Sequence, residues 1–294
     1  MSDSKIEPGL PLAPNVAPTR LRQIALVAKD LKKAEQQLTH VIGTEVIYVD
    51  PGVEQWGLKN ILVAIGGDVV EVVSPFKDGT TAGRLLSKRG DGGYMIIMQT
   101  VDATKQRNYI ESKGLSKVIW SHESNQSVAY QYHPRGIQGG MMPELDSHFP
   151  SKENPTPITS RFSPWHACRN DYASYSAGMK RTSDLSLVGA VCRLAPGDID
   201  TDAAAAQWEH TFGIAKSRDG LAFTNARLDF IRGIPGSPEG LVSVTIAVKG
   251  KDRFDAILER ASKEGLCGDG WINMVGIRWY FVLEDDNAGS QSRL

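Results

Sequence analysis

Two polar side chains interrupt stretches that otherwise have the composition of buried β-strands. Gln23 stands in the run LRQIALVA, and Glu71 has two valines on each side in the run VVEVV. Because side chains alternate between the faces of a strand, Glu71 shares a face with Val69 and Val73, and Gln23 shares one with Leu21. A carboxylate on an apolar face needs a partner or a raised pKa. Such a group is suited to proton transfer near neutral pH.

A third polar residue, Glu144, follows Pro143 in the run GMMPEL. A proline inside a strand indicates an edge position or a bulge. Each of the three polar residues also has a structural explanation. Glu71 would face solvent or pair with an arginine, Gln23 would be a buried amide with satisfied hydrogen bonds, and Glu144 would be exposed. The sequence leaves both kinds of explanation open.

Four methionines and two aromatic residues are candidates for the walls of an apolar pocket. The methionines come from two stretches, residues 94–101 and 140–145, that we expect to be neighbouring strands. Alternation requires about half of them to lie in the core instead. If the others face a pocket, its substrate has an apolar or aromatic body. The set is Met95, Met98, Met141, Met142, Trp56 and Tyr132.

The histidines are weaker candidates for catalysis. His133 lies in the turn HPRG, which favours a structural role or a hydrogen bond at the rim of a cleft over a role as general base. His166 lies in a connecting segment, where a packed aromatic segment is favoured over a mobile lid. His40 is expected at the surface of a helix. Neither a glycine-rich phosphate loop nor a nucleophile elbow is found in the sequence.

A strand that runs directly into a helix recurs along the chain, and this repeat has to position the candidate residues. Residues 21–28 lead to Asp30 and a helix, and residues 94–101 lead to Asp102 and a helix. The two aspartates are 72 residues apart, and either can cap the helix that follows it. Three short strands follow each helix, so each unit has the order βαβββ.

Two further units of the same kind follow a proline-rich break. They start near Leu185 and Leu241, with helices expected after Asp200 and over residues 251–263. We therefore predict an α+β protein of four βαβββ modules that form two consecutive domains. The boundaries are a flexible arm over 1–19, a first domain over 20–146, a linker or lid over 147–184, a second domain over 185–284 and a tail over 285–294.

The paired βαβββ units resemble the vicinal oxygen chelate superfamily, which includes glyoxalase, bleomycin-resistance and methylmalonyl-CoA epimerase-like proteins. The resemblance is carried by residues 21–31, by VVEVVSP at 69–75, and by HPRG followed by GGMMPEL at 139–145. It covers residues 20–146 well, whereas residues 185–284 match in the order of elements and not in motif residues. The resemblance implies two glyoxalase-like domains, each with a cupped sheet and outer helices.

The resemblance also implies one divalent metal, Mg²⁺, Mn²⁺ or Zn²⁺, in the first cup. Carried over position by position, its ligands are Gln23, Glu71 and Glu144. The fourth position, where the family has a histidine, is occupied by Met95, or by Ile96 if the register is shifted by one residue. A thioether is a poor ligand for such cations, so this departure weakens the expected site. The second cup is expected to bind no metal.

The resemblance implies proton transfer next to a carbonyl, in an isomerase, epimerase or lyase that acts on a largely apolar substrate. Glu71 or Glu144 would be the general base, and Gln23, Trp56, Met95, Tyr132, His133 and Met142 would bind the substrate. The chemistry would be assisted by the metal if one is bound. The alternative is a non-catalytic binding protein of the bleomycin-resistance type, which the missing histidine favours.

The composition narrows the range of partners. The 294 residues carry 33 basic and 34 acidic side chains. The chain therefore has no surplus of basic residues of the kind that indicates binding to a nucleic acid or an anionic membrane. The sequence shows no membrane-spanning run and no secretory signal. The three cysteines have no paired spacing, which favours a reducing compartment and a cytoplasmic location. A homodimer is compatible with the sequence.

Overall fold

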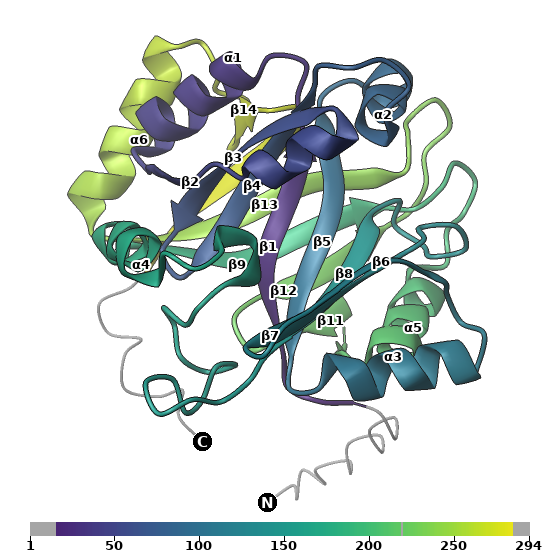
Figure 1. Ribbon diagram of the computed structural model, residues 1–294. Coiled ribbons are helices and arrows are strands. Elements are labelled where there is room, and N and C mark those ends of the chain that lie inside the picture. The colour runs from purple at the N-terminus through teal and green to yellow at the C-terminus, as the bar shows by residue number, and fades with distance from the viewer. Residues whose placement is uncertain (1–15, 219, 285–294) are drawn as a thin grey trace, which may run out of the picture.

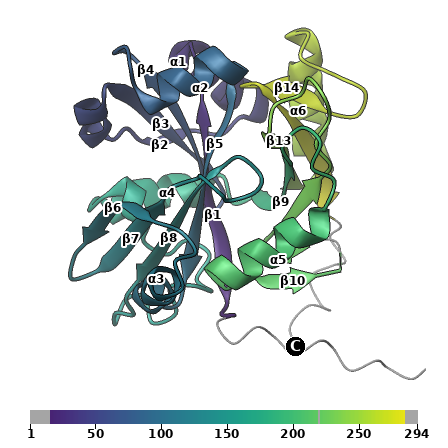
Figure 2. The ribbon, with the colours of Figure 1, turned by 90° about the vertical axis from the view of Figure 1, so that its right-hand side faces the viewer.

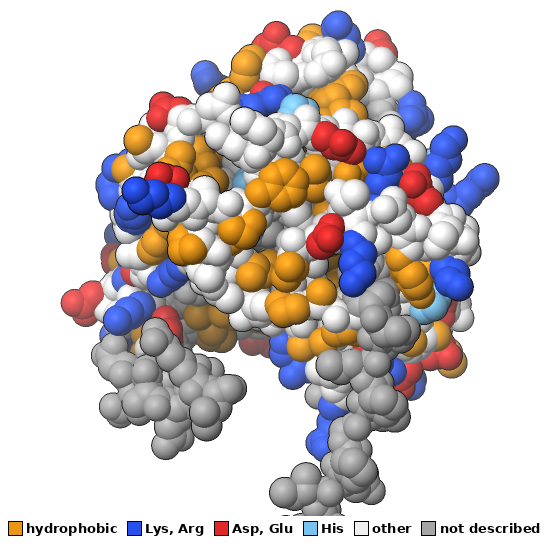
Figure 3. All heavy atoms as spheres, turned by 60° about the horizontal axis from the view of Figure 1, so that its bottom comes forward, with side chains coloured by type: hydrophobic (Ala, Val, Ile, Leu, Met, Phe, Trp, Pro, Cys, Tyr) orange, Lys and Arg blue, Asp and Glu red, His pale blue; other side chains and the backbone are white. Residues whose placement is uncertain are grey.

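The computed structural model describes residues 16–218 and 220–284. Most of the predicted N-terminal arm and the predicted tail lie outside these ranges. The described residues form two β-sheets with helices around them (Figure 1). None of the described helices is long and apolar enough to cross a membrane. On the face shown in Figure 3, basic and acidic side chains are interspersed with hydrophobic ones.

The first sheet contains the eight strands of the first two units, in the order β2-β3-β4-β1-β5-β8-β7-β6. The central strands β1 and β5 are antiparallel, and each pairs in parallel with the last strand of its own unit, β4 or β8. The two units therefore meet at the middle of one continuous sheet. The strands are β1 Thr19–Val27, β2 Val46–Tyr48, β3 Leu58–Ile65, β4 Asp68–Pro75, β5 Gly92–Thr100, β6 Val118–Glu123, β7 Ser127–Tyr132 and β8 Met142–His148.

The repeated aspartates cap the first helix of each unit. The Asp30 side chain accepts a hydrogen bond from the backbone N–H of Lys33, and Asp102 accepts one from Lys105. The helices are α1 Leu31–Gln36, continued by a π-helical segment Gln37–Ile42, then α2 Thr81–Arg89 and α3 Ala103–Ser112. The sequence did not predict the 3₁₀ helix Pro51–Trp56, which precedes β3.

The second sheet has seven strands in the order β10-β11-β12-β9-β13-β15-β14. Its first unit is a complete βαβββ module, whereas its second unit has one strand fewer among the described residues. The elements are β9 Leu185–Arg193, α5 Thr201–Phe212, β10 Ala215–Ser217, β11 Gly220–Ala222, β12 Arg227–Ile231, β13 Gly240–Lys249, α6 Lys251–Lys263, β14 Ile272–Met274 and β15 Ile277–Glu284.

The position predicted for Pro143 is wrong. Strand β8 lies between β5 and β7, so it is not an edge strand, and no register shift interrupts its pairing. The proline is tolerated because the ladder to β7 begins only at the next residue, where Glu144 pairs with Gln131. Glu144 is buried and not exposed.

The two sheets share one hydrophobic core. It includes Leu21 and Ile96 from the first sheet, Leu187 and Trp279 from the second, and apolar side chains of α3, α5 and α6. Figure 2 shows the two sheets side by side, with α5 and α6 beside the second sheet. Helix α3 contacts α5, and α6 contacts the π-helical segment Gln37–Ile42. The outer face of each sheet is therefore buried against the other domain.

The connector, residues 149–184, covers part of the opposite face of the first sheet. It contains a short 3₁₀ helix His166–Cys168 and the helix α4 Tyr172–Arg181. Trp165, Tyr175 and Met179 pack there against Ala25 and Val69 of the central strands. The segment predicted as a linker or lid is thus a packed layer on the inner face of the first cup.

Candidate active site

A β-bulge in β1 aims Gln23 into the first cup. Leu21 pairs with Met98 and Gln23 pairs with Ile97, so Arg22 is an extra residue between them. Leu21 consequently packs in the core between the sheets, while Gln23 faces the cup. The sequence-based assignment of Leu21 and Gln23 to one face is wrong for this reason.

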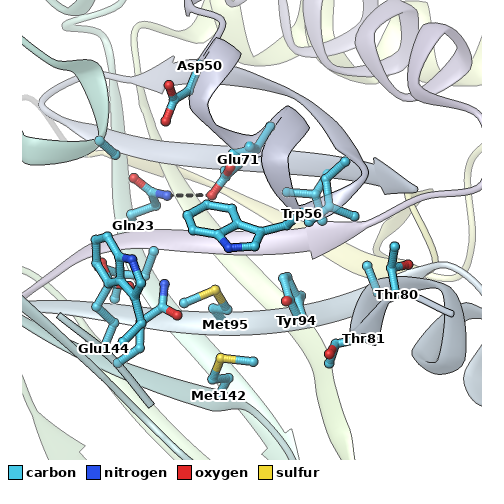
Figure 4. A pocket seen from close by; sticks show the side chains of 18 of the residues that line it. Gln23, Asp50, Trp56, Glu71, Thr80, Thr81, Tyr94, Met95, Met142 and Glu144 are labelled. Atoms are coloured by element: carbon cyan, nitrogen blue, oxygen red, sulfur yellow. Dashed lines mark hydrogen bonds between the residues drawn. The ribbon is translucent and has the colours of Figure 1, made fainter. Parts of the chain in front are cut away.

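A cavity of about 470 Å³ opens over the inner face of the first sheet. Gln23, Glu71, Met95 and Glu144 from the four central strands line its base (Figure 4). Its walls are mainly apolar and aromatic, and they include Val53, Trp56, Leu58, Tyr94, Ile97, Ile119, Trp120 and Met142. The volume is in the range of cavities that bind small organic molecules.

Glu71 is 9% exposed and is held by two amide groups. Gln23 Nε2 donates to Glu71 Oε2 at 2.9 Å, and Asn60 Nδ2 donates to Glu71 Oε1 at 2.6 Å. Burial raises the pKa of Glu71 to about 7, with a further contribution from the negative charge of Asp50, while the two amide hydrogen bonds lower it. The result is a carboxyl group that titrates near neutral pH.

The amide of Gln23 is itself fixed by the connector. The indole Nε1–H of Trp165 donates to Gln23 Oε1 at 2.6 Å. Gln23 therefore accepts from Trp165 with its oxygen and donates to Glu71 with its nitrogen. Both functional atoms of this side chain are engaged within the protein.

Glu144 is the counterpart of Glu71 in the second unit, and it is 6% exposed. Burial raises its pKa to about 7, a hydrogen bond with Gln131 lowers it, and the negative charge of Glu71 raises it. Asp146 follows on the same face of β8, and burial beside Glu144 raises its pKa well above the ordinary value. No amide, amine or hydroxyl group of the described residues donates to Asp146. A hydrogen bond between the two carboxyls raises the pKa of Asp146 and lowers that of Glu144, which places the proton between them on Asp146.

The strand registers of the two units show which residue of β5 corresponds to Gln23. In the first unit Gln23 pairs with Val69 and Ala25 with Glu71, whereas in the second unit Met95 pairs with Met142 and Ile97 with Glu144. Met95 is therefore the counterpart of Gln23, and Ile96 faces the core between the sheets.

These donors fit a divalent metal poorly. The Gln23 oxygen accepts from an indole, both Glu71 oxygens accept from amides, and the position of the fourth ligand holds a thioether. The described residues contain no cluster of three or more His, Cys, Asp or Glu side chains with metal-binding geometry. Metal binding in the first cup stays a prediction that this hydrogen-bond network does not favour.

Aromatic side chains and one ion pair form the rim of the cavity. The rings of Trp56 and Trp120 meet edge to face at 6.3 Å, and Trp120 lies 6.3 Å from the ring of His166. Burial lowers the pKa of His166 to about 4, so its ring is neutral at pH 7. Arg169 of the connector pairs with Asp50 at 3.1 Å.

Two predicted substrate-binding residues lie away from the cavity. Tyr132 is fully buried on the outer face of the sheet, where its ring packs against Phe212 at 5.6 Å. His133 is exposed in its turn, and its Nδ1 accepts the backbone N–H of Arg135. Both predictions are wrong, because the alternation of β7 directs Tyr132 toward the second domain and the turn lies beyond the cup.

The other predicted site residues are brought together. Gln23, Trp56, Glu71, Met95, Met142 and Glu144 all line the one cavity. Of the four methionines, Met98 and Met141 lie in the core between the sheets, as alternation requires. The sequence analysis missed Asn60, Tyr94, Trp120, Trp165 and Arg169. Tyr94 directly precedes Met95, so alternation alone would have placed it on the opposite face of the strand.

The second sheet offers no comparable set of groups. Its strand β12 carries Asp229 at the position that corresponds to Glu71, and β15 carries Arg278, which stacks on the ring of Trp271 at 4.3 Å. None of the residues that line the cavity of the first cup comes from this sheet.

Comparison with models of known protein families and with curated proteins found no match. Solved structures do resemble the chain. A hypothetical protein from Staphylococcus aureus covers 90% of this chain and 100% of its own length, with a TM-score of 0.56 and 12% identity. This likeness extends over both domains and agrees with the repeated βαβββ topology. The chain has the vicinal oxygen chelate fold.

Two shorter solved structures match about half of the chain. A methylmalonyl-CoA epimerase from Streptomyces coelicolor, in complex with 2-nitronate-propionyl-CoA, covers 45% of this chain and 99% of its own, with 21% identity and a TM-score of 0.40. The epimerase from Mycobacterium tuberculosis covers 47% and 93%, with 19% identity and a TM-score of 0.40. At these identities, activity has to be argued from the site.

Proposed function

We propose that this vicinal oxygen chelate protein is an acid/base enzyme that moves a proton next to the carbonyl group of a small, largely apolar molecule. Isomerisation, epimerisation and elimination all belong to this class. The observation that carries the proposal is the pair Glu71 and Glu144. Both carboxyls are buried at the base of one apolar cavity, and both have pKa values raised to about 7.

The charges and hydrogen bonds around the two carboxyls suit different roles. Glu71 accepts from two amide N–H groups, which favours its ionised form and suits a general base. Burial and the negative charge of Glu71 raise the pKa of Glu144, so Glu144 in its protonated form suits a general acid while Glu71 is ionised. Glu71 takes the proton from the carbon next to the carbonyl; the C–H electron pair becomes a C=C bond, and the C=O π pair moves onto the oxygen to give an enolate. Glu144 then gives its proton to that carbon, or to the far end of a conjugated double bond, and the carbonyl re-forms.

The remaining groups of the cavity are suited to orienting a substrate. The hydroxyls of Thr80, Thr81 and Tyr94 line the cavity (Figure 4), and burial raises the pKa of Tyr94 to about 12, so it stays a neutral donor. A hydroxyl donor near the carbonyl oxygen would stabilise the developing negative charge. Trp56, Trp120 and Met142 would enclose an apolar or aromatic body and exclude water.

The proposal is tested by hydrogen exchange at carbon. The protein is incubated in D₂O with a panel of aryl- and alkyl-substituted thioesters, ketones and 2-oxo acids, and deuterium uptake next to the carbonyl is followed by NMR. We expect uptake with at least one aromatic or branched member. The rate of uptake should fall at least about 100-fold in Glu71→Gln and in Glu144→Gln.

Glu259→Gln, which changes an exposed carboxylate on α6, is the matched control and should exchange at the wild-type rate. Full activity in Glu71→Gln contradicts the assignment.

A non-catalytic binding protein is the second candidate. The observation that favours it is that the polar groups of Gln23 and Glu71 are already satisfied within the protein, as in a preformed binding site. Calorimetry with the same panel separates the two functions. Tight binding of an aromatic compound with no deuterium uptake favours the binder.

A further inference from the structure

Trp165 occupies a fixed position beneath the connector. The residue is 1% exposed, and its ring contacts the guanidinium of Arg22, at 5.2 Å, and the ring of His148, at 5.6 Å. Its backbone N–H donates to the hydroxyl of Tyr175 at 3.0 Å. The indole is therefore held by two side chains and through its own backbone.

The indole decides which way the Gln23 amide points. An indole N–H donates and never accepts, so the partner 2.6 Å from it has to be the amide oxygen. The amide nitrogen is thereby directed at Glu71, 2.9 Å from its Oε2. In the opposite orientation the amide oxygen would face the carboxyl, and only a protonated Glu71 could bond with it.

We propose that Trp165 is a positioning residue, which fixes the orientation of the Gln23 amide so that its nitrogen donates to Glu71. The connector between the two domains then sets a hydrogen bond inside the first cup, although Trp165 and Gln23 are 142 residues apart in the chain. The proposal rests on the proposed function for its role in catalysis. Its effect on Glu71 is measurable without a substrate.

The other groups around Glu71 do not depend on Trp165, so a change at Trp165 alters only the orientation of the Gln23 amide. Asn60 on β3 donates to the other oxygen, and Asp50, which precedes the 3₁₀ helix, opposes ionisation by its charge. Burial keeps Tyr94 on β5 and Cys168 on the connector neutral at pH 7, because the pKa of each is raised to about 12. Glu144 on β8 couples to Glu71 by charge. Replacing Trp165 removes none of these groups.

The test is a ¹³C NMR titration of the glutamate carboxyls, with the Glu71 signal assigned by its absence in Glu71→Gln. Trp165→Phe keeps an aromatic ring and removes the N–H donor, so we expect the pKa of Glu71 to rise by about one unit. Trp208→Phe is the matched control. It removes another buried indole donor, bonded to the carbonyl of Gln138 in the core between the sheets, and should leave the pKa of Glu71 unchanged.

A double-mutant cycle checks that Gln23 transmits the effect. Gln23→Met alone should also raise the pKa of Glu71, and adding Trp165→Phe to it should produce no further rise. An unchanged Glu71 pKa in Trp165→Phe overturns the proposal. A shift of equal size with and without Gln23 also overturns it, because Trp165 would then act through packing.

The unmodified protein gives a second readout that does not depend on the folding of Trp165→Phe. The indole N–H signal of Trp165 should move with pH at the same midpoint as Glu71, and this movement should vanish in Glu71→Gln. An indole signal that does not follow Glu71 overturns the proposal. A confirmed relay without any deuterium uptake would refute the enzymatic function and leave the relay intact.

Discussion

At the scale of single residues, the site is defined by carboxyl groups in a place that disfavours their charge. The folded-state pKa of Glu71 and of Glu144 is about 7, against an ordinary value of 4.5. Between these values the folded protein binds more protons than the unfolded chain does. The free energy of unfolding therefore falls as pH rises from about 4.5 to about 7, and the loss is complete above pH 7.

This linkage predicts that removing the charge of Glu71 stabilises the protein at alkaline pH. Glu71→Gln should exceed the wild type in free energy of unfolding at pH 8, by up to about 3 kcal/mol. The difference should disappear below about pH 3.5, where Glu71 is protonated in both the folded and the unfolded state. Urea denaturation at the two pH values measures it, with Glu259→Gln as the control. A difference that is the same at both pH values contradicts the raised pKa.

At the scale of elements, the periodicity of strands predicts much of the site but not its details. Alternation and the 72-residue repeat place Glu71, Met95 and Glu144 correctly on the inner face. The bulge at Arg22 shifts the side-chain alternation of β1 by one residue, so Leu21 was assigned to the wrong face. The packing of the connector against β1 was not predicted, because these contacts depend on the tertiary structure and no local pattern in residues 149–184 encodes them.

The connector yields a prediction about local stability. Tyr175→Phe removes the hydroxyl that accepts the buried N–H of Trp165, which leaves that group unsatisfied. We expect amide hydrogen exchange in residues 163–168 to accelerate about tenfold, with β13 unchanged. Hydrogen exchange with mass spectrometry measures this. Tyr172→Phe is the control, since its hydroxyl is exposed and donates to the carbonyl of Phe162. Equal exchange rates in both variants would contradict a role for Tyr175 in anchoring the connector.

At the scale of the whole molecule, the second domain supports the site without contributing to the cavity. Its loop residue Asn225 accepts the backbone N–H of Leu21 and donates to the Leu21 carbonyl, both at 3.0 Å. Leu21 lies before the point where β1 starts to pair with β4 and next to the bulge. Asn225 therefore supplies the backbone partners that the ladder lacks there. The backbone N–H of Thr224 extends the same contact to the carbonyl of Thr19.

A change in this loop should consequently affect both folding and the site. Asn225→Ala leaves the two backbone groups of Leu21 without their partners and removes a bond to Asp68, 3.1 Å away. We expect the free energy of unfolding to fall by about 2 kcal/mol. Deuterium uptake should also fall, because the bulge that aims Gln23 at Glu71 loosens.

Denaturation and exchange at carbon measure the two effects. Asn125→Ala, in the exposed β6–β7 turn, is the control. Loss of stability with unchanged uptake would mean that the bulge holds its shape without the second domain. Loss of both would identify the second domain as the support that keeps Gln23 in place.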